Sequence, residues 1–184
     1  YSTTAMSAAE KFTAPSMHHI FGTDNFGRDI FSRVMQGLGT TLVISTSVVL
    51  FSAVAGVLLG AFTGYFGGIL DEILMRITDA VNGFPSILLT LVIISLLGKG
   101  RQNVIIALGI VFIPSFVRIV RGEFLRLRDA DYIKRARLMG VGRLRILFIH
   151  ILPNIFSVLL VSVMIGFNNA ILAESGMSYL GIGV

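Results

Sequence analysis

The residues of this chain that are best suited to chemistry gather in one stretch, Asp129 to Asn154, and the chemistry they suit is binding. Nine of the fifteen Lys and Arg residues fall between Arg118 and Arg145, with only three acidic residues among them. Uncharged runs long enough to cross a bilayer lie on both sides of this stretch. A basic loop between spans is placed in the cytoplasm by the positive-inside rule. We therefore expect a cytoplasmic loop over 118–150 that docks a partner.

Within this loop, the pattern predicts a helix, a glycine turn and a second helix. Asp129 is expected to cap a helix that begins at Ala130 and stops before Gly140, because glycine suits the left-handed conformation that ends a helix. The second helix, over 143–150, leads to Pro153, and proline is favoured where the next membrane helix opens.

The first of these helices is amphipathic. Spacing places Tyr132, Ala136 and Met139 on one face, and basic residues cover the rest. Two interpretations remain open at this point: the helix docks a protein, or it lies on anionic lipid headgroups. Composition alone does not separate them.

Polar residues outside the loop give weaker signals. Asn168 and Asn169 are adjacent amides inside an apolar run, where a buried amide needs protein or a water-filled cavity. They either line a solute pathway or tie two helices together. Asp79 is expected to pair with Arg76, three residues away on the same helix.

Near the N-terminus, Asp24, Arg28 and Asp29 form either a network that meets an extracytoplasmic protein or a local turn with internal ion pairs. His18 and His19 lack the further ligands of a metal site, so no metal is expected. The spans contain no paired acids, Ser–Lys couple or His cluster, so a membrane-embedded enzyme is disfavoured and no catalytic residue is expected.

Composition assigns the chain to the membrane class. It is 54% hydrophobic and 14% charged, whereas soluble domains average about 25% charged residues. Four uncharged runs predict four spans, because about 20 residues cross a bilayer; these runs are 34–70, 80–98, 102–117 and 151–173. The absence of cysteine excludes disulfides and thiolate metal sites. The net charge of +5 sits in one loop and does not indicate nucleic-acid binding.

Alternation of the spans gives the expected domain organisation. Residues 1–37 form an extracytoplasmic N-terminal segment, and residues 38–184 form the transmembrane domain. An extracytoplasmic start without Met or a signal-like apolar segment suggests further sequence upstream in a longer protein.

Small residues recur at every fourth position along the first span and put a ridge on one helix face, where a neighbouring backbone can approach closely. The ridge consists of Ser52, Gly56, Gly60, Gly64 and Gly68. We favour packing within the chain over an interface between subunits. Pro85 and Pro114 are expected to mark helix starts or kinks.

Several motifs occur in a fixed order along the chain. Lys134-Arg135-Ala136 is followed after three residues by Gly140 and, further on, by Leu152-Pro153. The segment 21–29 reads F-G-T-D-N-F-G-R-D, and 178–184 reads S-Y-L-G-I-G-V. Together these motifs resemble bacterial ABC importer permeases that carry the so-called EAA motif, and especially their dipeptide, oligopeptide and nickel subgroup. In that motif Glu stands where this chain has Lys134, and Ala where it has Arg135.

This resemblance implies an all-α, polytopic membrane protein. The fold would be the helical bundle of a type I ABC importer permease, with four spans here and the family's outer spans missing. The subunit would be non-catalytic and would reside in the bacterial or archaeal cytoplasmic membrane, in contact with lipid. Its partners would be a second permease, expected to be a different chain, two cytoplasmic ATPases and an extracytoplasmic solute-binding protein. ATP and Mg would bind the ATPases, so no cofactor is expected on this chain.

The resemblance also implies a coupling helix, over about Ala130 to Leu138, that contacts the ATPase. The residues implied to take part in coupling are Asp131, Tyr132, Lys134, Arg135, Ala136, Arg137, Leu138 and Gly140. The chain has no G-x-x-x-x-G-K-[ST] loop, in agreement with ATP binding by a partner.

The activity implied is translocation of a peptide-type solute by alternating access. Nickel or another small solute of the subgroup is the alternative. A self-sufficient channel or secondary transporter is a third hypothesis, and a loop that binds an ATPase separates it from the first. The sequence favours peptide but does not identify the solute.

Overall fold

The computed structural model describes residues 6–7 and 10–182; from Ile30 onward these residues are mainly helical, and before Ile30 they form an irregular loop with an isolated bridge between Thr23 and Asp29. They fall into two compact units, one up to Val43 and one from Ile44 onward. Helix α1 (Ile30–Phe66) contributes residues to both. The predicted all-α class is confirmed.

In the first unit, Asp24 closes a turn. Its carboxylate accepts hydrogen bonds from the backbone N–H groups of Phe26 and Arg28, at 2.8 and 3.0 Å. It also pairs with the guanidinium groups of Arg28 and Arg33, at 2.7 and 2.6 Å. Of the two interpretations of this region, the local turn with internal ion pairs is the arrangement found.

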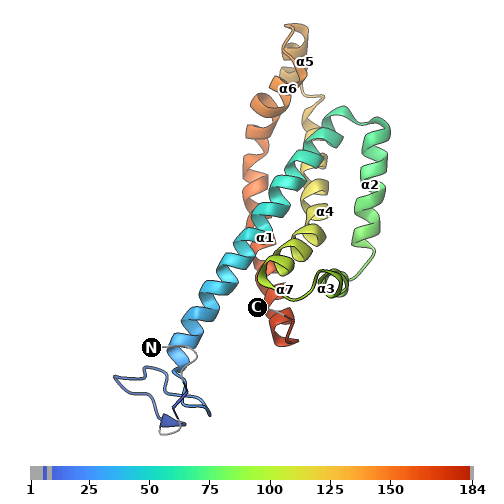
Figure 1. Ribbon diagram of the computed structural model, residues 1–184. Helices are drawn as coiled ribbons and strands as arrows, with labels where there is room; N and C mark the ends of the chain where they lie inside the picture. Colours follow the sequence, from blue (N-terminus) through green and yellow to red (C-terminus); the bar gives the residue numbers. More distant parts are fainter. Residues whose placement is uncertain (1–5, 8–9, 183–184) are drawn as a thin grey trace. The chain divides into compact units, whose positions relative to one another are not determined.

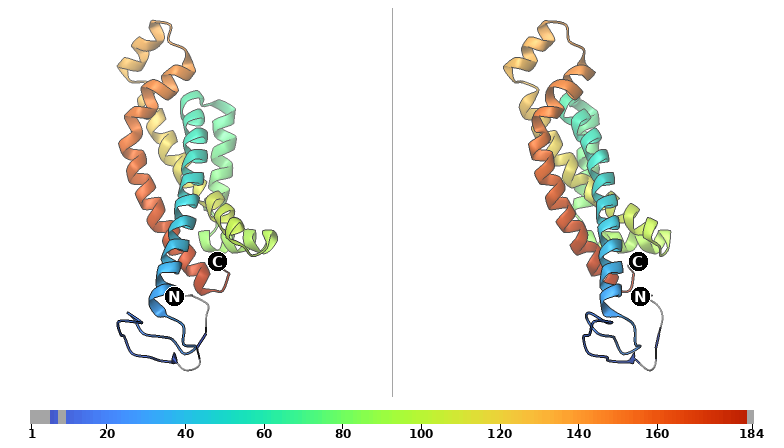
Figure 2. Two further views of the ribbon diagram at one scale, coloured as in Figure 1. Left: turned by 60° about the vertical axis from the view of Figure 1, so that its left-hand side comes forward. Right: turned by 90° about the vertical axis from the view of Figure 1, so that its left-hand side faces the viewer.

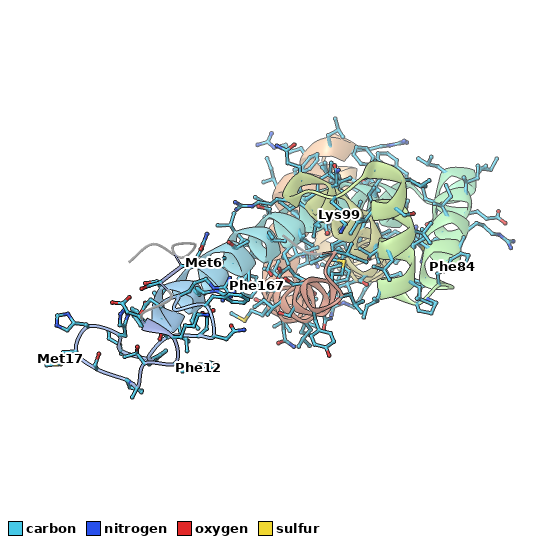
Figure 3. The ribbon with its side chains drawn as sticks, turned by 60° about the horizontal axis from the view of Figure 1, so that its bottom comes forward. Met6, Phe12, Met17, Phe84, Lys99 and Phe167 are labelled. Carbon is cyan, nitrogen blue, oxygen red and sulfur yellow. The ribbon has the colours of Figure 1, made fainter. Side chains whose placement is uncertain are left out.

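Asp29 fixes the other side of the same loop. Its carboxylate accepts hydrogen bonds from Nδ1 of His19 at 2.9 Å and from the backbone N–H and hydroxyl of Ser32 at 2.8 and 2.6 Å. Phe12 is 75% exposed and Met17 is fully exposed. Figure 3 shows both side chains on the outside of the loop.

The second unit is a bundle of helices (Figure 1). After α1 come α2 (Gly68–Asn82), α3 (Ser86–Leu97), α4 (Arg101–Leu127), α5 (Asp131–Leu138), α6 (Arg143–Arg145), a π-helical turn (Ile146–Ile151), a 3₁₀ turn (Leu152–Ile155) and α7 (Phe156–Tyr179). Among the described residues, three helical stretches are long and apolar enough to cross a membrane: α1, α4 and the run Arg143–Tyr179. The α2–α3 pair is a fourth candidate span.

The span predicted over 80–98 is not one straight helix. Helix α2 ends at Asn82, α3 begins at Ser86, and the two are bent by 94°. Pro85 stands immediately before α3 and cannot continue α2, because it has no N–H to donate and disfavours helical geometry in the residue before it. Pro85 therefore marks a helix start, as predicted, but it also divides the uncharged run. Pro114, by contrast, lies inside α4.

Helices α1 and α4 pack closely through the ridge of small residues. A Cβ built on Gly56 would lie 2.3 Å from Cβ of Phe116, one on Gly60 2.7 Å from the carbonyl oxygen of Val117, and one on Gly64 2.7 Å from that of Arg121. The predicted packing within the chain is confirmed for these positions. It does not extend to Gly68, which faces open space and has a φ of +73°.

Two hydrophobic clusters fill the second unit. One surrounds Val48, Leu108 and Phe116, where α1 and α4 meet α7. The other joins Tyr65 and Phe124 to residues that follow α4, at the end of the bundle that carries α5 and α6. Figure 2 shows α7 running beside α4 in both views, and α3 lying toward the end of the unit opposite to α5.

The close approach of α1 and α4 predicts a marked difference between two glycine substitutions. Gly60→Ala should lower the free energy of unfolding by about 1–3 kcal/mol, because the new methyl meets backbone that cannot move aside cheaply. Gly122→Ala, on α4 with no heavy atom within 4 Å of the built Cβ, should be neutral or stabilise by up to about 1 kcal/mol. SDS titration of the full-length protein measures both, and equal effects would contradict the packing.

The N-terminal loop should loosen in acid. The hydroxyl of Ser32, and then His19, lower the pKa of Asp29 from 3.8 to about 2. Partial burial acts to raise the pKa of Asp24. Hydrogen bonds from the backbone N–H groups of Arg28 and Phe26, together with the Arg28 guanidinium, lower it by more, so the pKa of Asp24 is also about 2. Since both pKa values are depressed, the stabilisation is present above about pH 4 and is lost as the pH falls toward 2.

Hydrogen-exchange protection of residues 19–33, corrected for intrinsic rates, measures this loss. Asp29→Asn should lower protection already at pH 5 and flatten its decline in acid. Glu10→Gln is the matched control, because Glu10 lies 3.9 Å from His19 and makes a longer contact than Asp29 does. Unchanged protection in Asp29→Asn would show that this carboxylate does not hold the loop.

Candidate functional site

Helix α5 forms the core of the predicted coupling loop. It spans Asp131–Leu138, and the chain leaves it through Met139 and through Gly140, whose φ is +78°. Asp131 lies in the first turn, and Arg135 and Arg137 lie in the last, which suits the helix dipole at both ends. The predicted helix and its glycine stop are therefore present.

The start of α5 differs from the prediction. Ala130 occupies the N-cap position and no side chain caps the helix. Asp129 lies one residue too early, and its carboxylate is 3.5 Å from the guanidinium of Arg128. The predicted cap by Asp129 was wrong by one position, and the acidic residue nearest the free N–H groups is Asp131.

The buried face of α5 also differs from the predicted one. Ile133 is fully buried and Ala136 nearly so, whereas Tyr132 and Met139 are exposed. Ile133 and Ala136 join the cluster around Phe124 and Tyr65. The predicted face took Tyr132 as apolar, but a tyrosine can leave its hydroxyl end in water, and the fully apolar Ile133 takes the inner position.

The opposite face of α5 presents the remaining coupling candidates to the surroundings. Asp131, Lys134, Arg135, Arg137 and Leu138 are all exposed, Leu138 by 88%. Lys134 lies 3.9 Å from Asp131, an exposed pair of little energetic weight. The loop therefore offers a basic face with one large apolar side chain at its end.

Three contacts tie this loop to the bundle. The guanidinium of Arg137 lies 5.3 Å from the centroid of the Tyr65 ring, within the range of a cation–π interaction. The amide nitrogen of Asn154 lies 3.5 Å from the hydroxyl of Tyr132, and Arg128 donates to the carbonyl of Gly64 at 3.4 Å. Tyr65 and Gly64 are far from α5 in sequence, and their role could not be inferred from spacing.

Ion pairs join α2 to α4. Asp71 and Arg121 form a two-pronged pair, at 2.5 and 2.6 Å, with side chains only 14% and 28% exposed. Asp79 pairs with Arg118 at 2.6 Å in a more exposed position. The predicted pair of Asp79 with Arg76 is wrong, because the antiparallel neighbour α4 offers Asp79 a closer partner.

A cavity of about 500 Å³ lies between the α2–α3 corner, α4 and α7. The two adjacent amides predicted as pathway candidates separate here: Asn169 lines the cavity and Asn168 does not. Phe84, labelled in Figure 3, lines it from the corner between α2 and α3. Sequence reasoning missed the other polar lining residues because they come from four different helices.

In the described part of the chain, no three His, Asp or Glu side chains gather in a way that could hold a metal ion. The chemistry on offer is therefore that of the basic face of α5 at one end of the bundle and of the cavity beside α7.

Burial of Ile133 predicts a matched pair of effects on the coupling loop. Ile133→Ala should destabilise the local fold by about 2–5 kcal/mol, because it removes a fully packed side chain. Leu138→Ala should change it by less than about 0.5 kcal/mol, because Leu138 is exposed. In the full-length permease without partners, trypsin should cleave between Lys134 and Arg145 much faster in Ile133→Ala than in the wild type or in Leu138→Ala. Equal cleavage rates in the two variants would contradict the packing of α5.

Comparison with known proteins agrees with this architecture. Residues 56–184 match the family model described as binding-protein-dependent transport system inner membrane component. A protein of Brucella suis biovar 1, provisionally named a peptide transport system permease, is 45% identical over 97% of this chain and 60% of its own length. The dipeptide transport system permease protein DppC of Alkalihalophilus pseudofirmus is 39% identical, over 95% of this chain and 58% of its own length.

The oligopeptide transport system permease protein OppC of Bacillus subtilis is 39% identical over 100% of this chain and 60% of its own length. This chain thus spans about 60% of the length of these relatives. The family match covers both the close α1–α4 packing and the α5 loop. The chain belongs to the family of binding-protein-dependent transport system inner membrane components.

Proposed function

We propose that this chain is part of a membrane-spanning permease subunit that imports peptides at the expense of ATP. The observation that carries the proposal is α5: a short, basic helix that is packed on its inner face by Ile133 and Ala136 and exposed on its outer face. Family membership and the names of the relatives, which are those of peptide, dipeptide and oligopeptide permeases, support the same function. The membrane is the cytoplasmic membrane of a bacterium or archaeon.

The end of the bundle that carries α5 faces the cytoplasm in this proposal. Nine of the fifteen basic residues, from Arg118 to Arg145, belong to this end, as the positive-inside rule requires. Residues 1–37 then lie outside the membrane. There the closed loop around Asp24 and Asp29 is available to a solute-binding protein.

The docking partner of α5 is an ATPase subunit. Asp131, Tyr132, Lys134, Arg135 and Leu138 form the contact face, and Gly140 lets the chain turn away from it. Lys134 and Arg135 stand where the family's motif has Glu and Ala, so the matching groove is expected to be acidic. ATP and Mg bind the ATPase subunits, and a second permease of different sequence completes the pathway.

Movement passes from α5 into the bundle through its packed face. Ile133 and Ala136 contact the same cluster as Phe124 of α4 and Tyr65 of α1, so a push on α5 acts on both helices at once. The Arg137–Tyr65 contact adds a polar link to α1. Closure of the ATPases thus shifts the helices between inward-facing and outward-facing arrangements.

Site-directed crosslinking tests the docking of α5. Single cysteines replace Arg135 and Leu138 in the full-length protein, co-expressed with its ATPases; this chain contributes no cysteine of its own. We expect crosslinks to the ATPase that change in yield when ATP is added. Ser95→Cys is the control, because Ser95 is exposed on α3, toward the other end of the unit.

Crosslinks to lipid alone from both α5 positions, with transport intact, would show that the basic helix lies on the membrane surface. An equal crosslink from Ser95 would show that the assumed sidedness is wrong. Either outcome would remove the main support for an ATP-coupled permease.

A further inference from the structure

The cavity beside α7 has the size of a ligand site. Its volume is about 500 Å³, within the range of roughly 300–1,000 Å³ typical of small-molecule sites. Its walls come from the α2–α3 corner, from α4 and from α7, represented by Phe84, Phe112 and Leu172. Three elements that lie far apart in sequence therefore converge on one space.

The polar side chains in this wall are all uncharged. They are Asn82, Ser86, Ser115, Ser162 and Asn169. Among the described residues that line the cavity there is no Asp, Glu, Lys, Arg or His. A site for a bare nickel ion would present imidazole, carboxylate or thiolate ligands, so this lining does not suit the metal.

Some of these polar groups have unused hydrogen-bonding capacity. The hydroxyl of Ser162 donates to the carbonyl of Val158 at 2.8 Å and is thereby occupied. In the part of the chain that the structure describes, the side chains of Asn82, Ser115 and Asn169 take no part in a hydrogen bond. Each asparagine side chain offers both a donor and an acceptor.

A peptide group has the same two functions, one N–H and one C=O. Amide side chains on two walls of a cavity can therefore meet a peptide backbone whatever side chains it carries. The apolar surface between them, from Phe84, Ile87 and Phe116, accepts varied side chains without selecting a charge. Because the described residues of the wall carry no ionisable side chain, the wall offers neither a cationic nor an anionic peptide side chain an ion-pair partner.

We infer that this cavity binds the backbone of the peptide in transit and that Asn169 keeps the step indifferent to the charge of peptide side chains. The inference rests on the proposed function and assigns the substrate contact within it. Asn169 is the sharpest probe, since its neighbour Asn168 has the same chemistry and depth but points about 100° away around the helix.

Charge substitution tests the assignment in the complete importer, reconstituted in proteoliposomes with its ATPases and binding protein. Uptake of two tripeptides that differ in one Lys or Glu is measured below saturation. Relative to the wild type, Asn169→Asp should raise the Lys-to-Glu uptake ratio by about tenfold, and Asn169→Lys should lower it by a similar factor. Asn168→Asp should leave the ratio within about twofold, because Asn168 does not line the cavity.

The outcomes separate two failures. If the wild-type importer takes up neither peptide with ATP, the proposed function falls. If it takes up both, but the ratio stays constant in the two Asn169 variants or shifts equally in Asn168→Asp, only the present inference falls. The inference is supported if the Lys-to-Glu uptake ratio shifts in opposite directions in Asn169→Asp and Asn169→Lys and does not shift in Asn168→Asp.

Thiol labelling keeps the test decisive if the charged variants fail to assemble. Asn169→Cys and Asn168→Cys are introduced into an importer in which any cysteines of the other segments and subunits have been replaced, and both variants are treated with a small hydrophilic maleimide; the residues of this chain contain no cysteine. Peptide and binding protein should slow labelling at 169 by several-fold and leave labelling at 168 unchanged. Equal protection at both positions, or at neither, would overturn the assignment.

Discussion

The close approach of α1 and α4 is the constraint on which the rest of the second unit depends. Gly56, Gly60 and Gly64 leave no room for a side chain against α4, so the two backbones meet along the whole inner half of α1. The contact aligns Tyr65 with Phe124 at one end and brings Phe116 within reach of Gly166 of α7 further along. In a membrane, where apolar side chains gain little by leaving lipid for one another, such packing is a main source of helix association.

The contact between α1 and α4 also explains how the basic loop can carry many charges and still be held firmly in place. Helix α5 has only eight residues, too few for a stable helix in isolation. It is ordered because Ile133 and Ala136 complete a cluster whose floor is the α1–α4 pair. Lys134 and Arg135 are exposed and make no contact with the described part of the bundle, so they can be matched to a partner without disturbing the fold.

Much of this architecture could be predicted from the sequence, and the errors have physical causes. Helix α5, its stop at Gly140 and the ridge from Ser52 to Gly64 follow from local rules, because glycine and small residues act through their own backbone and volume. Pro85 was predicted to mark a helix start or kink, but the division of the uncharged run 80–98 was missed, because an absence of charge identifies an apolar segment and not a straight helix. The partner of Asp79 and the inner face of α5 depend on Arg118 and Phe124, which only the tertiary fold brings near. Similarly, the convergence of Asn82, Ser115 and Asn169 on one cavity leaves no trace in their spacing.

The corner between α2 and α3 has a consequence for the hydrogen bonding of the backbone in a bilayer. A helix that stops leaves its last carbonyl groups without partners in the same helix, and acyl chains cannot supply the missing hydrogen bonds. Within the hydrocarbon region of a bilayer, irregular backbone is stable only where it contacts protein or lines a water-filled cavity. Phe84 and Ser86 of the corner line the cavity together with residues of α4 and α7, so on that side the corner faces other parts of the protein. The bend thus leaves backbone groups at the corner that hydrocarbon alone cannot satisfy, so this corner has to be covered by the protein itself or by water.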